Sequence, residues 1–157
     1  MIRVAAFKVH QGDFLSRAIE AETRGSESHI ALEIAPLIII EAFYPCVRKR
    51  PLDPSETAGI DFYKIAGLTP DHEAQILAYC EKAIADHQTY SIVDLFRFNA
   101  FFRMFLGEAK DADKSAFCSM FAKAAIESSG IKLLNAHDYE VDPHRLTWST
   151  QLEKDAA

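Results

Sequence analysis

Residues 29–44 read HIALEIAPLIIIEAFY, and this stretch does most to set the architecture of the chain. The segments 29–34 and 37–44 are rich in β-branched and apolar residues, which are typical of strands. Ala35-Pro36 interrupts them, because proline cannot donate a hydrogen bond to a strand ladder. The stretch therefore predicts a β-hairpin.

Beyond this hairpin the pattern predicts one more strand and then helices. Residues 45–59 hold three prolines and are typical of a loop, whereas 60–66 favour a third strand. Helices are predicted over 69–86, 90–105 and 115–129, where apolar residues recur at helical spacing. Strands followed by helices indicate an α+β fold. We expect one domain over residues 1–150 and a frayed tail over 151–157.

Length and charge exclude several classes of function. The chain has 157 residues, 49% of them apolar, which suits one domain with a sizeable core. Its formal net charge of -6 gives no general attraction to nucleic acid or anionic lipid. The basic run Arg48-Lys49-Arg50 is interpreted as part of a solvated loop.

No apolar run is long enough for a transmembrane segment, and the first residues do not resemble a signal peptide. A cytoplasmic protein is therefore expected, although a phage-encoded protein exported without a signal would look the same. No motif for zinc, a nucleotide or a flavin is visible, so no cofactor or metal is predicted.

The three cysteines must be explained one by one, because their number is odd and none are spaced as C-x-x-C. Cys80 lies among apolar residues of a predicted helix and is expected in the core. The surroundings of Cys46 indicate little. Cys118 lies in the first turn of the predicted helix 115–129, where the helix dipole favours a thiolate. It is either a nucleophile or a small buried side chain.

A cysteine nucleophile needs a base and a group that orients the base. His29 opens the first hairpin strand, directly after the loop 23–28. If the turn is centred on Ala35, His29 faces Glu41 directly, and a carboxylate lies against the imidazole. If the register differs by one residue, the two side chains point to opposite faces, and Glu41 is an exposed strand carboxylate.

Several motifs, taken in chain order, resemble the circularly permuted NlpC-type proteins of the papain-like superfamily, which also contains lecithin:retinol acyltransferase. They are GDFLSR at 12–17, SHIA at 28–31, IEA at 40–42, FCS at 117–119 and Asp142-Pro143. As in that group, the histidine strand precedes the cysteine helix, the reverse of the order in papain. Met120 and Ser91 depart from the usual pattern, which puts contacts with substrate in question.

The resemblance implies a papain-like fold, with an antiparallel β-sheet or barrel packed against helices. It implies Cys118 as nucleophile, His29 as base and Glu41 as the third member of a triad. The expected activity is that of a cysteine peptidase or amidase acting on a peptide, amide or acyl substrate, with cell-wall peptides as one class. The alternatives are a lipid acyltransferase or deacylase on the same fold, and a binding module without catalysis.

Overall fold

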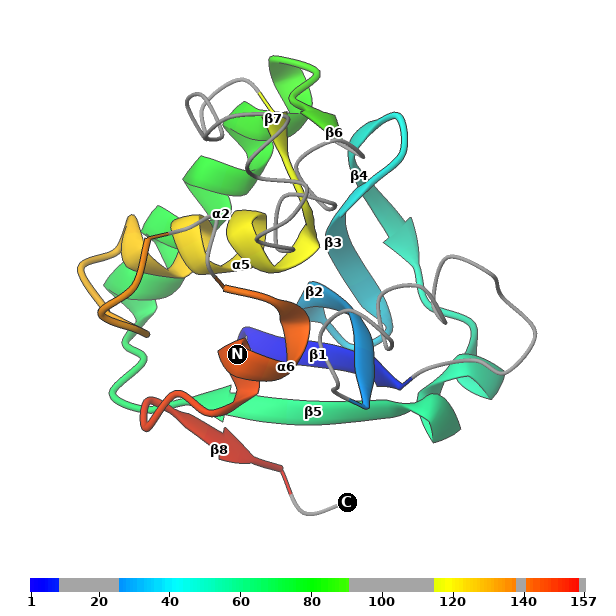
Figure 1. Ribbon diagram of the computed structural model, residues 1–157. Helices are drawn as coiled ribbons and strands as arrows, with labels where there is room; N and C mark the ends of the chain where they lie inside the picture. Colours follow the sequence, from blue (N-terminus) through cyan, green and yellow to red (C-terminus); the bar gives the residue numbers. More distant parts are fainter. Residues whose placement is uncertain (9–25, 91–114, 138–140, 156–157) are drawn as a thin grey trace, which may run out of the picture.

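The computed structural model shows an α+β fold, in which an antiparallel sheet packs against helices (Figure 1). It describes residues 1–8, 26–90, 115–137 and 141–155. The strand order is β7-β6-β4-β3-β2-β1-β5-β8, and neighbouring strands are antiparallel except for the parallel pair β6 and β7. Because β7 and β8 form two separate edges, the described sheet is open, and the barrel that we considered is not formed.

The sheet consists of β1 (Arg3–Lys8), β2 (Glu27–Ala35), β3 (Ile38–Phe43), β4 (Cys46–Pro51), β5 (Ile60–Ile65), β6 (Thr89–Tyr90), β7 (Ser115–Ala116) and β8 (Leu152–Lys154). The helices are the 3₁₀-helix η1 (Pro54–Gly59) and the α-helices α2 (Pro70–Ala85), α5 (Cys118–Glu127) and α6 (Pro143–Thr147).

The elements with the clearest local signals were predicted correctly. The hairpin is β2 and β3, the third strand is β5, and the helix predicted over 69–86 is α2. Thr69 caps α2 by accepting a hydrogen bond from the backbone of His72, and Pro70 follows at the first helical position. The helix predicted over 115–129 is α5, but it begins only at Cys118, because Ser115–Ala116 pairs with β6.

Other elements differ from the prediction. β1 was not predicted, and β4 lies in the segment 45–59 that was predicted as a loop. α6 lies in a segment without a regular pattern. The frayed tail is wrong for residues 152–154, which pair with β5 as β8. Of the helix predicted over 90–105, Tyr90 belongs to β6 and the remainder lies outside the described residues.

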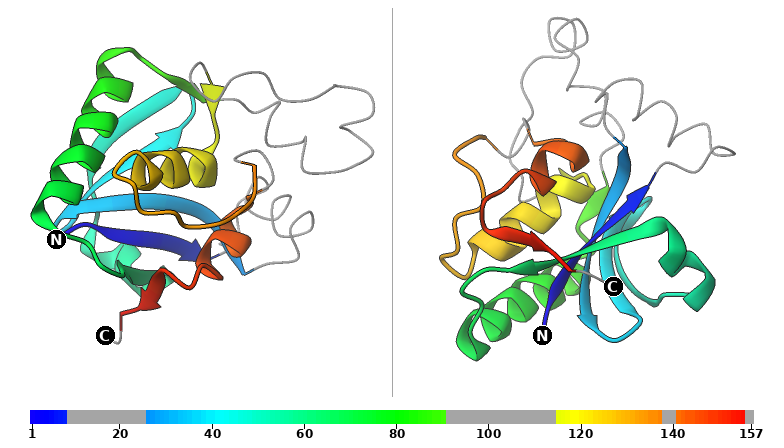
Figure 2. Two further views of the ribbon diagram at one scale, coloured as in Figure 1. Left: turned by 90° about the vertical axis from the view of Figure 1, so that its left-hand side faces the viewer. Right: turned by 90° about the horizontal axis from the view of Figure 1, so that it is seen from below.

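The core lies on both faces of the central strands. On the helix side, α5 packs against β2 and β3, and α2 packs against α5 (Figure 2). On the other face a smaller cluster contains Ala5, Ala31, Ile39, Leu52 and Ile60. The central strands are therefore covered on both sides. In the described ranges, no helix is both long and apolar enough to cross a bilayer.

Candidate catalytic site

Cys118 is the first residue of α5. Phe117 precedes it in an extended conformation and accepts the first helical hydrogen bond, from the amide of Phe121 at 2.9 Å. The first amides of a helix have no acceptors within that helix, so the amides beside Cys118 can donate to another group. The side chain lies in the interior, and Cys118 is only 1% exposed.

His29 lies near the beginning of β2, between two aromatic rings. The ring of Phe7 on β1 is 5.3 Å from the imidazole, and that of Phe43 on β3 is 6.0 Å away and edge-on, both measured between centroids. The side chain of His29 remains 18% exposed. The two rings restrict the tilt of the imidazole while leaving one part of it accessible.

Glu41 on β3 binds the imidazole from the neighbouring strand. His29 Nε2 lies 2.9 Å from Glu41 Oε2, a normal hydrogen-bond length. Only 1% of the Glu41 side chain is exposed. A carboxylate buried to this extent needs charged or polar partners, because an unpaired buried charge is very costly.

The hairpin register differs from both of the registers that we considered. Leu32 is paired with Ile40, and the ladder shifts near the turn. Counting outward from this pair sets Glu41 opposite Ala31 and His29 opposite Phe43. His29 and Glu41 are therefore diagonal neighbours rather than directly opposed. The offset is two residues, so both side chains stay on one face of the sheet, within reach of each other.

Two arginines on β4 complete the surroundings of Glu41. Arg48 donates to Glu41 Oε1 from Nε at 2.9 Å and from Nη2 at 2.8 Å. Arg50 donates from Nε to the same oxygen at 2.8 Å. One carboxylate oxygen thus accepts from both guanidinium groups, and the other faces His29. Charge-assisted contacts of this kind are the strong hydrogen bonds of proteins.

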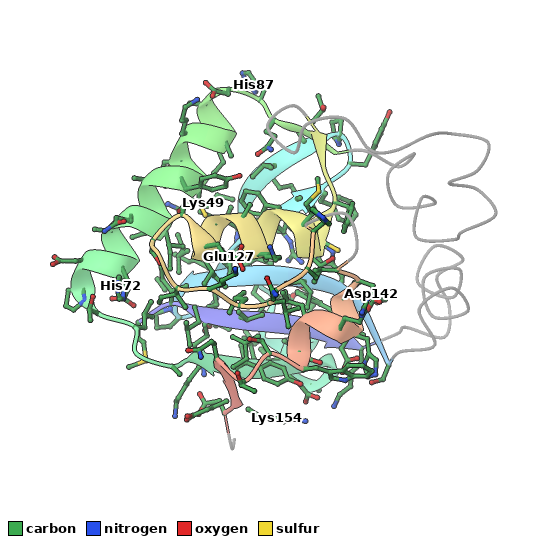
Figure 3. The ribbon with its side chains drawn as sticks, turned by 60° about the vertical axis from the view of Figure 1, so that its left-hand side comes forward. Lys49, His72, His87, Glu127, Asp142 and Lys154 are labelled. Carbon is green, nitrogen blue, oxygen red and sulfur yellow. The ribbon has the colours of Figure 1, made fainter. Side chains whose placement is uncertain are left out.

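The interpretation of Arg48-Lys49-Arg50 as a solvated loop is wrong for both arginines. These residues lie on β4, so alternate side chains point to opposite faces. Lys49 Nζ lies 3.4 Å from Glu81 Oε1 on α2. Figure 3 shows Lys49 on the side of the sheet where α2 lies. The pattern Arg-x-Arg could have indicated that both arginines bind a buried glutamate on the neighbouring strand. It has this meaning only if residues 46–51 are known to form a strand.

The ionisation of the site follows from these contacts. Burial alone lowers the pKa of His29, but the charge of a Cys118 thiolate and hydrogen bonds to Cys118 and Glu41 raise it from 6.5 to about 9. Burial alone raises the pKa of Glu41, but His29, Arg50 and Arg48 lower it from 4.5 to about 2. At neutral pH the favoured state has a charged imidazolium and a charged carboxylate.

Cys118 and Glu41 approach the same imidazole. Glu41 binds Nε2, and the Cys118 sulfur is the other side-chain hydrogen-bond partner that affects the pKa of the ring. The structure thus brings together the three residues that the sequence selected, from α5, β2 and β3. Chemically, this arrangement can hold a thiolate and imidazolium pair, with the imidazolium oriented by a carboxylate.

The other cysteines have different surroundings. Cys80 is fully buried in α2, and burial raises the pKa of its thiol to about 12. Cys46, at the start of β4, is half-buried. The expected core position of Cys80 is confirmed. Among the residues that the structure describes, no three His, Cys, Asp or Glu side chains are arranged to hold a metal ion.

A second histidine and carboxylate pair lies at the start of β2. His144 Nδ1 on α6 is 2.5 Å from Glu27 Oε2, and the His144 ring contacts Trp148. This pair joins α6 to β2, two elements that also pack against each other. We assign it a structural role in the fold.

We compared the sequence with protein-family models and with curated proteins. No protein-family model matches the chain, and no curated protein matches it significantly.

Proposed function

We propose that this chain is a thiol hydrolase with a papain-like arrangement, in which Cys118 attacks an amide carbonyl. The proposal rests chiefly on one observation. The imidazole of His29 is hydrogen-bonded to a buried glutamate on the adjacent strand, and the sulfur at the start of α5 is near enough to raise the pKa of the same ring. A nucleophile, a base and a group that orients the base are the minimum for this chemistry.

In the first half of the reaction, the Cys118 thiolate forms a bond to the carbonyl carbon, and the C=O π electrons move to the oxygen. In this proposal, amides in the first turn of α5 donate to that oxygen, because they have no acceptors within the helix. The C–N bond then breaks, and the His29 imidazolium transfers its proton to the leaving nitrogen. The products are a free amine and an acyl thioester on Cys118.

In the second half, neutral His29 removes a proton from water as the water oxygen attacks the thioester carbon. The C–S bond breaks, which releases a carboxylic acid and restores the thiolate and imidazolium. Glu41 stays ionised throughout, because both arginines and His29 hold its pKa near 2. Its role is to orient the ring and to stabilise its positive charge.

One observation favours a second candidate, a binding module in which the cysteine does not react. Cys118 is 1% exposed, so a carbonyl reaches its sulfur only if the surroundings of the sulfur open. Hydrolysis therefore requires an accessible state that a binding module does not need. Thiol alkylation distinguishes the two candidates.

The test is the rate of alkylation by iodoacetamide at pH 6, followed at each cysteine by peptide mass spectrometry. A thiolate kept by His29 should react there faster than Cys46, and Cys80 should stay unmodified because its thiol is buried with a pKa of about 12. His29→Ala should slow Cys118 alone, by at least about tenfold, because the partner imidazolium is lost.

A Cys118 that reacts no faster than Cys46, or whose rate does not change in His29→Ala, would support the binding module. Turnover is then tested on a library of peptides that includes cell-wall peptides, with new amines detected by mass spectrometry. Cys118→Ala is the control, since it keeps the Glu41 network but lacks the sulfur. Products formed equally by this variant would come from another source.

A further inference from the structure

Ser119, the residue after the proposed nucleophile, is bonded to the segment that leads into α6. It is fully buried, and its Oγ donates to Val141 O at 2.6 Å. Val141 is itself only 1% exposed, so both ends of this bond lie in the interior. Because Ser119 belongs to the first turn of α5, the bond attaches the turn that carries Cys118 to the chain at Val141.

The segment from Val141 to His144 has little freedom to bend. Asp142 caps α6, since its Oδ1 accepts from the backbone of Arg145 at 2.8 Å, and it lies where the chain enters that helix (Figure 3). Pro143 follows at the first helical position, and its ring fixes the backbone φ there. A displacement of Val141 is therefore passed on to His144.

At its other end, this segment is bonded to the strand that carries the proposed base. His144 Nδ1 lies 2.5 Å from Glu27 Oε2, and only one residue of β2 separates Glu27 from His29. The ladder with β1 shifts between these two residues, so Ser28 forms a bulge. Bulges redirect nearby side chains and are frequent beside active sites.

These bonds complete a cycle of contacts that includes both proposed reacting groups. Its members are linked by hydrogen bonds or by short stretches of chain, and they are Cys118, Ser119, Val141, His144, Glu27 and His29. The cycle closes where the sulfur of Cys118 affects the pKa of the His29 imidazole. Glu41 lies outside this cycle, since it binds His29 from β3. The imidazole and the sulfur are thus connected through α6 as well as through the sheet.

We propose that Ser119 and His144 are positioning residues, which set how the first turn of α5 meets the imidazole of His29. As a role in hydrolysis this rests on the proposed function, because the pair that is positioned is the one that would react. Neither residue is assigned a contact with substrate, and each acts through the segment 141–144. Loss of either bond releases the same segment, so a second loss should add little to the first.

The experiment measures the rate of Cys118 alkylation by iodoacetamide at pH 6 and at pH 10 in the full chain. The quantity compared is the ratio of the two rates, in which a change in the accessibility of the sulfur cancels. At pH 10 a thiol is ionised without help, whereas at pH 6 it needs a cationic partner. In Ser119→Ala and in His144→Phe the ratio should fall by about threefold to tenfold, the equivalent of one hydrogen bond. The double variant should match either single variant.

Two variants serve as controls. Ser149→Ala removes a bond of the same kind, from a buried serine hydroxyl to Leu133 O at 2.7 Å, just beyond the other end of α6 and outside the cycle. Its ratio should equal that of the wild type. His144→Asn keeps a side-chain N–H close to the position of Nδ1, so its ratio should fall by less than half of the His144→Phe effect. A ratio unchanged in Ser119→Ala or in His144→Phe, or lowered equally by Ser149→Ala, would overturn the inference.

The pKa of His29, titrated by NMR, separates this inference from the proposed function. It should be lower in Ser119→Ala and in His144→Phe than in the wild type, because the contact with the Cys118 sulfur that raises it is weakened. If this pKa falls but Cys118 reacts no faster than Cys46, the proposed function fails, and the role in hydrolysis fails with it. If Cys118 alkylation depends on His29 but neither the ratio nor the pKa responds to the two variants, the hydrolase site stands and the positioning role is wrong.

Discussion

Arg50 Nε lies 2.8 Å from Glu41 Oε1, and the same guanidinium binds both carboxylate oxygens of Glu56 from its Nη atoms. Glu56 in turn accepts a hydrogen bond from the backbone of Asp53 in the capping box of η1. The carboxylate beside His29 is therefore connected through one arginine to a short helix outside the hairpin. The position of Glu41 depends on this connection as well as on β3.

Arg50→Met should destabilise the fold more than the neighbouring change Lys49→Met. The first leaves buried Glu41 with one guanidinium fewer and Glu56 without its partner, at a cost of about 2 kcal/mol. The second removes an exposed contact to Glu81 and should change the free energy of unfolding by less than about 0.5 kcal/mol. Urea unfolding measures both values, and equal values would contradict the role given to Arg50.

The pKa of His29 should be about 9 in the wild type when its ring protons are titrated by NMR. Cys118→Ala removes a negative charge and a hydrogen bond, and Glu41→Gln removes another negative charge, so each variant should titrate at a lower pH. Burial opposes the charged ring. In the double variant the pKa of His29 should therefore lie below 6.5. A pKa of His29 that is the same in wild type and in all variants would show that neither group faces the ring.

Glu41 also predicts how stability falls in acid. Its pKa is lowered to about 2, so its contribution is complete above its ordinary pKa of 4.5 and is lost as the pH falls through 2. By pH 3 the loss should amount to about 2 kcal/mol. Glu41→Gln lacks this loss but keeps the other carboxylates. The difference in unfolding free energy between wild type and Glu41→Gln should therefore shrink from pH 6 to pH 3. Urea unfolding measures this difference, and a value that does not change with pH would contradict the prediction.

Glu127 at the end of α5 should matter for the segment that follows (Figure 3). Its Oε1 accepts from the amides of Leu133 at 3.0 Å and Leu134 at 3.4 Å, and its Oε2 binds Lys123 at 2.8 Å. Glu127→Ala should cost about 2 kcal/mol, because two backbone donors lose their acceptor. Glu81→Ala, in an exposed pair, should cost less than about 0.5 kcal/mol by thermal or urea unfolding. Comparable losses would mean that Glu127 does not hold this segment.

The parts of the fold that were predictable carry their signal in neighbouring residues. Two β-branched runs on either side of Pro36 are enough to indicate a hairpin, and Thr69-Pro70 is enough to begin a helix. β1 lacks such a signal, since Val4, Ala5 and Ala6 are all buried and no alternation appears. A strand covered on both faces does not show the period of two.

The parts of the site that were missed depend on contacts between distant residues. The turn lies at residues 36–37 and the ladder shifts by one residue beside it, so the pairing differs by two from that expected for a turn at Ala35, although His29 and Glu41 stay on one face. Arg48 and Arg50 were missed because prolines at 45 and 51 frame their strand and suggested a loop. Both arginines bind Glu41, which lies on another strand.

Within the described residues, the side-chain bonds to Glu41 come from residues 29–50, whereas the sulfur lies on a separate helix. A chemist could therefore exchange the reacting atom, for example by Cys118→Ser or selenocysteine, while the frame that aims the imidazole keeps every one of those bonds. Under the proposed function, the nucleophile could be exchanged without changing the side-chain bonds that hold Glu41 against its base.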